Sequence, residues 1–274
     1  MPYRHSHYYV GFVLAVIMLG FWASYWSIAA SVRNAFHVHA ISAMAWLGLL
    51  IVQNLSIQRR HNALHKRMGM ASLVLFPFLI LGLVMIMDVA GQRYAAQESA
   101  FTMHNGPSFG IGTGIAIAAY LTLFYQALKN RRRVKLHAGY MLATPLILFE
   151  SPFSRVMEAY LPWMNVIGSD DIHIVQDTIA ISDGLVALFA LVLYSRDRRN
   201  GAPWLVAAGF CLFQAVVMWF GPYIPLMGTL FGAYATIPLP VTAAAGMAAG
   251  ILAGWLGWKA GAAPVRSAAT VAAA

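Results

Sequence analysis

Histidines are the residues of this chain whose type and position most directly suggest chemistry. They fall at the ends of long apolar runs, in two groups: His37, His39, His104 and His173 in one, and His5, His7, His61, His65 and His137 in the other. Imidazole within a bilayer is costly unless it pairs, lines a cavity or binds a ligand, so the pattern indicates a functional role. The alternative is that each histidine simply lies among lipid head groups at the interface.

The composition predicts a membrane protein. Of the 274 residues, 60% are apolar and 10% are charged, which excludes an ordinary water-soluble fold. Apolar runs of about 20 residues, long enough to cross a bilayer, recur about eight times. They cover 8–31, 38–57, 68–90, 107–128, 137–157, 172–195, 203–222 and 236–258. We therefore expect an all-α, polytopic membrane helix bundle, with residues 1–258 as a single membrane domain and 259–274 as a disordered tail.

The charge distribution predicts the orientation of these spans. The net charge is +9, and the basic residues cluster at 59–67, 129–135 and 195–200 and near the two ends of the sequence, leaving only Arg33, Arg93 and Arg155 on the other side. The positive-inside rule makes the basic side cytoplasmic. This predicts an integral protein of a bacterial inner membrane with both termini in the cytoplasm. Because topology explains the charge, no nucleic-acid partner is expected.

Two segments resemble each other and suggest an internal duplication. Residues 59–81 and 131–151 each contain a basic loop, a Leu-His pair and a proline-containing apolar run. If the repeat is real, spans two to five form a four-helix core that histidines enter from both sides. The alternative is a chance match between two basic membrane loops.

Two pairs of histidines have the depth that a b-type haem requires, which is one imidazole from each of two facing helices. His39 of span two can face His104 of span four, and His65 of span three can face His137 of span five. From His39 to Gln58 a helix rises about 28 Å. The two sites would therefore be stacked across the membrane, one in each leaflet.

The region 36–157 resembles the cytochrome b561 family. The resemblance is carried by "HAISAMAWLGLLIVQ", "LHKRMG", "MHNGPSFGIGTG" and "KLHAGY". It implies a four-helix core with two b haems, one bound by His39 and His104 and the other by His65 and His137. Eight spans exceed the family's usual six, and Lys66-Arg67 directly follows His65, where the two cations could pair with haem propionates.

Helical geometry leaves some ligand assignments open. His37 and His39 point about 200° apart on a helix, so only one of them can face the bundle. His61 and His65 share a helical face and resemble the spacing of metal-binding helices, but no acidic partner lies nearby, as a di-iron site would need. The lone Cys211 excludes an internal disulfide framework and a thiolate metal cluster.

Acidic residues support rival functions. His37, His39, His104, His173 and Asp177 form a pool from which zinc ligands could come, as in an intramembrane hydrolase. Asp183 and Glu150, both deep in their spans, could instead be relay groups of a protein that moves protons or solutes. A purely structural polar network, with Arg155 pairing Glu150 or Glu158, is a further alternative.

The sequence thus favours transmembrane electron transfer through two b haems. The lipid bilayer would be the protein's surroundings, and a small molecule or a quinone-like compound would be the electron donor or acceptor. A zinc-dependent intramembrane hydrolase and a cofactor-free transporter remain the alternatives.

Overall fold

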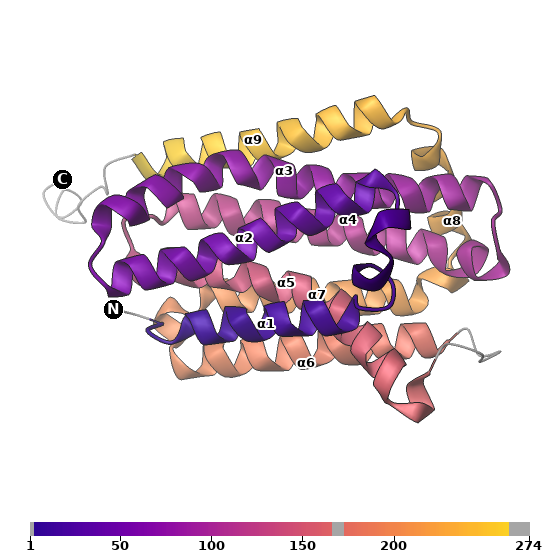
Figure 1. Cartoon of the computed structure of the whole chain (residues 1–274), viewed down its shortest axis with the longest axis horizontal. Helices are drawn as coiled ribbons and strands as arrows, with labels where there is room; N and C mark the ends of the chain where they lie inside the picture. The colour runs from indigo at the N-terminus through magenta and orange to yellow at the C-terminus, as the bar shows by residue number, and fades with distance from the viewer. Residues whose placement is uncertain (1–2, 166–172, 263–274) are drawn as a thin grey trace, which may run out of the picture.

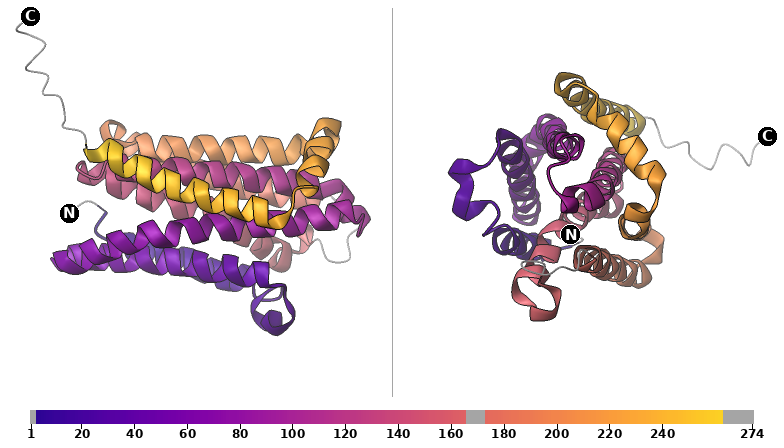
Figure 2. Two further views of the ribbon diagram at one scale, coloured as in Figure 1. Left: turned by 90° about the horizontal axis from the view of Figure 1, so that it is seen from above. Right: turned by 90° about the vertical axis from the view of Figure 1, so that its right-hand side faces the viewer.

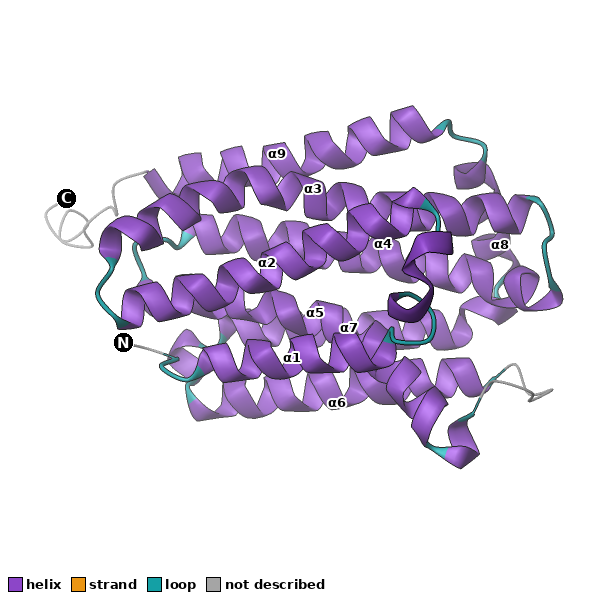
Figure 3. Ribbon diagram, in the orientation of Figure 1, coloured by secondary structure: helices purple, strands orange, loops and turns teal. Residues whose placement is uncertain are grey.

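The computed structural model describes residues 3–165 and 173–262, and its regular elements there are all helices (Figure 3). Long α-helices are joined by short turns and by short 3₁₀ segments. The α-helices are α1 (Ser6–Gly20), α2 (Asn34–Gln58), α3 (Asn62–Ala95), α4 (Ala100–Lys129), α5 (Val134–Tyr160), α6 (Ile174–Arg196), α7 (Ala202–Phe220), α8 (Pro225–Ala235) and α9 (Leu239–Ala262). The 3₁₀ segments are η1 (Trp26–Ser31), η2 (Pro162–Met164), η3 (Arg198–Asn200) and η4 (Gly221–Tyr223).

The long helices lie side by side and form one elongated bundle (Figure 1). The connections at 59–61, 130–133 and 197–201 gather at one end, which we call the basic end. The first and last described residues lie there too: the Tyr3 ring contacts Trp204 at the start of α7, and Arg131 donates a hydrogen bond of 2.7 Å to the carbonyl of Trp258 near the end of α9. The segments η1, η4 and α8 lie toward the opposite end (Figure 1).

A helix lies in each expected apolar run, in the expected order, but the limits differ and the additional helix α8 lies between two of the runs. Within the described residues, six elements are long and apolar enough to cross a membrane: α2, α3, α4, α6, the stretch 202–223 that contains α7, and α9. The all-α bundle is therefore confirmed. Helix α9 continues through residues 259–262, which the sequence had assigned to a tail, and residues 263–274 lie outside the described ranges.

The first helix is shorter than predicted. The apolar run 8–31 gives only α1, which ends at Gly20, and the chain then turns into η1. Gly20 lies directly against α5, because a Cβ atom built there would be 2.1 Å from the carbonyl oxygen of Pro152. The close contact with α5 requires glycine at this position.

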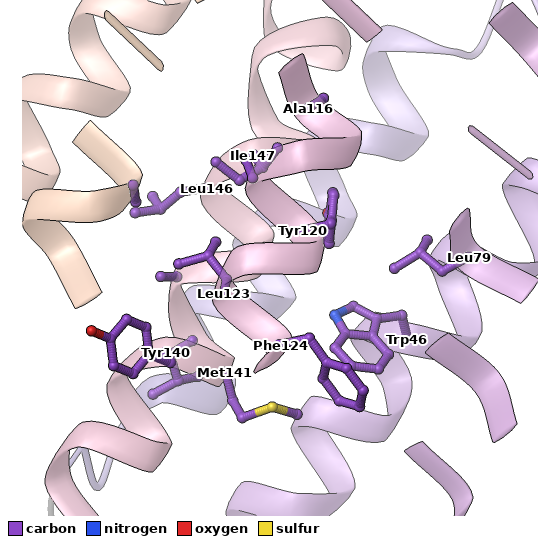
Figure 4. Packing of buried hydrophobic residues seen from close by; sticks show 14 of the residues in the cluster. Trp46, Leu79, Ala116, Tyr120, Leu123, Phe124, Tyr140, Met141, Leu146 and Ile147 are labelled. Atoms are coloured by element: carbon purple, nitrogen blue, oxygen red, sulfur yellow. The ribbon is translucent and has the colours of Figure 1, made fainter. Parts of the chain in front are cut away.

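The centre of the bundle is filled by aromatic residues. Trp46 of α2, Phe76 of α3 and Phe124 of α4 are fully buried, and the Phe76 and Phe124 rings stack with centroids 3.9 Å apart. The indole of Trp46 donates a hydrogen bond of 2.9 Å to Thr144 Oγ1 on α5, and the Tyr120 hydroxyl donates one of 3.0 Å to the Thr144 carbonyl. Figure 4 shows Trp46, Tyr120 and Phe124 together in this cluster.

Helix α9 packs on the flank formed by α3 and α4, as the end-on view of Figure 2 shows. Small residues allow this close approach, as is common between membrane helices. A Cβ atom built on Gly250 would lie 2.7 Å from Pro77 Cα, and one on Gly257 would lie 2.8 Å from the Tyr125 carbonyl oxygen. The glycines of α9 therefore set its distance from its neighbours.

Substitution of Gly250 by valine should destabilise the bundle by about 2 kcal/mol, because overpacking forces the helices apart. The loss of stability is measured by thermal unfolding of the detergent-purified protein. Unfolding is monitored as the disappearance of the monodisperse peak on size exclusion. Gly209→Ala on α7 is the control, since a Cβ atom there meets nothing within 4 Å. Equal stability of the two variants would contradict this packing.

Trp46→Phe should cost about 1–2 kcal/mol, because it removes the hydrogen bond to Thr144 and leaves a small void. The same thermal assay measures the loss. Ile41→Val on the exposed face of α2 is the control, and it should leave the midpoint unchanged. A Trp46→Phe protein as stable as wild type would show that this contact contributes little.

Candidate functional site

A cavity of about 640 Å³ lies in the half of the bundle toward the opposite end. Helices α2, α3, α4 and α5 surround it, and residues from α1, η1, α6 and α7 complete its wall. Most of the lining is aliphatic or aromatic. Its charged, imidazole and amide side chains are His39, Arg93, Glu150, Arg155, Glu158 and Gln214. Its size and mixed lining are typical of a site for a small organic ligand or cofactor.

His39 enters this cavity from α2. Its Nδ1 atom is buried and has no hydrogen-bond partner among the described residues. The α2 backbone is close to α3 here, because a Cβ atom on Gly82 would lie 2.7 Å from His39 Cα. His37, two residues earlier, lies instead 2.9 Å from the Tyr25 hydroxyl, outside the cavity lining. Only one of the two histidines thus faces the cavity, as helical geometry predicted.

His104 lies on the other side of α4 from the cavity. The cavity-facing stripe of α4 includes Thr102, Gly106 and Phe109, and the position of His104 is about 160° away from the centre of that stripe. Its ring centroid is 5.9 Å from those of His173 and Tyr223. The structure therefore does not bring His39 and His104 together in the cavity.

His65 and His137 both lie at the basic end, in the first turns of α3 and α5. They lie close enough to interact electrostatically. The Nδ1 atom of His137 is 2.8 Å from the carbonyl oxygen of Ala127. Because a carbonyl only accepts, Nδ1 carries the hydrogen and Nε2 keeps its lone pair. The Nδ1 atom of His65 is buried without a hydrogen-bond partner in the described part of the chain.

The sequence-predicted acidic residues lie where α5, α6 and α7 meet. Glu150 lines the cavity and accepts a hydrogen bond of 3.4 Å from Gln214. Asp183 is buried beside Glu150 and within hydrogen-bonding reach of Cys211. Sequence reasoning identified both carboxyl groups but not Cys211 or Gln214, because only the fold shows that α7 packs against α5 and α6.

Arg155 does not form the ion pair considered from the sequence. It donates hydrogen bonds to the carbonyl and hydroxyl of Ser151 at 2.8 and 2.7 Å, and it lies over the Phe21 ring. Glu158 accepts a hydrogen bond of 2.9 Å from Thr178. Both charged groups nevertheless lie near enough to act on Glu150.

The pool of zinc ligands is dispersed. His173 lies at the start of α6, with its ring 2.6 Å from the Tyr223 hydroxyl, and Asp177 is in the first turn of the same helix. His37 is bonded to Tyr25 on another side of the bundle. In residues 3–165 and 173–262, no group of three or more His, Cys, Asp or Glu side chains gathers as a metal site.

Ion pairs hold two of the connections between helices. Arg93 donates hydrogen bonds of 2.6 and 3.0 Å to Glu98, in the turn between α3 and α4, and this lowers the pKa of the Glu98 carboxyl. At the basic end, hydrogen bonds from Asn200 and then from Lys135 lower the pKa of Asp197. These exposed pairs contribute little stability, but they fix the loops beside both histidine sites.

No family model, curated protein or solved structure matches this chain.

A cysteine placed on the cavity wall should react with N-ethylmaleimide much faster than one placed in the packed core. Ala40→Cys provides the first, and Ala143→Cys, at a fully buried position, is the matched control. The native Cys211 is buried and should give a low background. Mass spectrometry of the labelled chain gives the rates, and equal rates would show that the cavity does not admit small molecules.

Proposed function

We propose that this chain is an integral membrane electron-transfer protein that holds b-type haem with histidines on facing helices. The observation that carries the proposal is the arrangement of His65 and His137 at the basic end. A bound haem supplies an iron that carries one electron at a potential set by its ligands and surroundings. The chain supplies the imidazoles, excludes water and binds the acidic side chains of the cofactor.

The basic-end pair fits the donor chemistry of haem iron. The hydrogen bond from His137 Nδ1 to Ala127 leaves Nε2 as the free donor atom, and a bond of this kind is the usual support of a metal-ligating histidine. His65 comes from a different helix and has an unpartnered buried ring nitrogen in the described structure. Lys66 and Arg67 follow it and supply cations for the propionates.

The large cavity could hold a second flat cofactor, with an imidazole ligand from one of its walls only. His39 contributes one imidazole, and aromatic residues such as Phe36 and Phe109 line the wall. His104, which the sequence paired with His39, faces His173 and Tyr223 instead. We therefore assign His39 as the protein ligand of the second haem, without His104.

We place the basic end in the cytoplasm of a bacterial cell, following the positive-inside rule. In this arrangement α1 and α5 cross the bilayer together with the six candidate membrane-spanning elements. The basic residues near His65 would attract an anionic or quinone-like electron donor or acceptor. The large cavity would open toward the periplasmic side.

The difference spectrum of the dithionite-reduced and oxidised protein tests this proposal, with haem quantified per chain. We expect a b-type α band and about two haems per chain. His65→Ala and His137→Ala should each remove the basic-end haem, because each variant lacks one of the two imidazoles that would hold it. His39→Ala should remove the other haem.

His61→Ala is the matched control, since His61 is exposed and lies one helical turn before His65. It should leave the haem content unchanged. A colourless protein from haem-replete cells would refute the proposal. Full haem content in both His65→Ala and His137→Ala would refute the assignment of the basic-end site.

A further inference from the structure

A buried polar column begins at the wall of the large cavity. Val175 and Ile179 of α6 line the cavity, and Asp183 lies one helical turn further along the same face. On α7, Gln214 lines the cavity and Cys211 lies about one turn deeper. Asp183 and Cys211 therefore lie just below the cavity, with Glu150 in the wall above them.

Asp183 is in an unusual state for a buried carboxyl group. It is 1% exposed, and its Oδ2 atom has no hydrogen-bond partner within the described ranges. Its charged or titratable neighbours are Glu150 and Cys211, neither of which can supply a positive charge. Two carboxyl groups this close in an apolar interior do not both stay ionised, so they retain a proton between them.

The column continues from Cys211 toward the basic end. Tyr9 of α1 lies near Cys211, and its hydroxyl is buried without a hydrogen-bond partner in the part of the chain that the structure describes. Ser6, one turn earlier on α1, has a buried hydroxyl in the same condition. Buried polar atoms without protein partners are rare, and ordered water is their usual partner. The hydroxyls of Tyr9 and Ser6 and the carboxyl group of Asp183 thus lie along one route through the bundle, each with a buried oxygen atom that lacks a partner in the described structure.

We infer that Glu150, Asp183, Cys211, Tyr9 and Ser6 form a proton-transfer path between the large cavity and the basic end. A proton taken up by Glu150 from the cavity passes to Asp183. Asp183 passes a proton through the Cys211 thiol to the hydroxyl of Tyr9. The Tyr9 hydroxyl in turn releases a proton to Ser6 and the basic end. Each group returns to its starting state, so the net change is the movement of one proton.

Charged groups lie at the cavity end of the path. Arg155 and Glu158 act on Glu150 at the cavity side. Tyr120 of α4 lies near Tyr9 and Cys211, but its hydroxyl already donates to the Thr144 carbonyl. Glu150 therefore lies near one basic and one acidic side chain at the cavity end of the path. The Tyr120 hydroxyl is held by its hydrogen bond and is not part of the path.

Proton flux into vesicles tests this inference. The protein is reconstituted without haem into liposomes that contain a pH-sensitive dye, and a potassium gradient with valinomycin makes the interior negative. Vesicles with wild-type protein should acidify faster than empty ones. Asp183→Asn and Tyr9→Phe should slow the protein-dependent flux by about tenfold or more, because each removes a group that exchanges protons.

Two further variants separate transport from folding. Asp183→Glu restores a carboxyl group and should recover most of the flux. Asp88→Asn changes a buried carboxyl outside the path, where Tyr234 and Thr242 donate hydrogen bonds to it, and should leave the flux unchanged. Each variant must elute as a monodisperse peak.

The inference is overturned if wild-type vesicles acidify no faster than empty ones, if Asp183→Asn keeps the wild-type flux, or if the Asp183-dependent flux requires Na⁺. Because no haem is needed, these outcomes are independent of the electron-transfer proposal.

Discussion

The hydrogen bond from Trp46 to Thr144 joins two helices that otherwise have little contact with each other. Helices α2 and α5 close the ring formed by α2 to α5, yet they pack against each other over only a short stretch. Trp46 joins them there, in a centre that also contains Phe76 and Phe124. Toward the opposite end, residues of both helices line the large cavity. A well-packed centre thus permits an open half without loss of the fold.

In the apolar surroundings of a membrane, a buried polar atom without a hydrogen-bond partner is costly in free energy. In a bilayer, polar groups must find partners within the protein, and most do so: Asp88, for example, accepts hydrogen bonds from α8 and α9. The exceptions among the described residues are therefore informative. They include ring nitrogens of His39, His65 and His104 and an oxygen of Asp183, which are buried without partners in the described structure. Such atoms cost stability, and a cofactor or an exchangeable proton offsets that cost.

Sequence periodicity predicted the helices and the basic end because apolar run length and loop charge are local properties. It also predicted that only one of His37 and His39 faces the bundle interior. It could not orient His104, since both sides of α4 are covered by other helices and either side can bury an imidazole. The close contact of Gly20, the last residue of α1, with Pro152 of α5 was equally hidden, because the two residues are distant in sequence. Contacts between distant segments decide these features, and a single sequence does not contain them.

The two proposed activities share the large cavity. Reduction of a group bound beside His39 would add negative charge in a region of low dielectric constant, where it attracts a proton strongly. Glu150 lies in the same wall and adjoins Asp183, the next group of the polar column. A proton that follows the electron would neutralise this charge without requiring water to fill the cavity. The basic end offers a different environment, because Lys66 and Arg67 adjoin its histidines and already balance added negative charge. Electron transfer between the two ends would therefore change the protonation of the cavity side much more than that of the basic end.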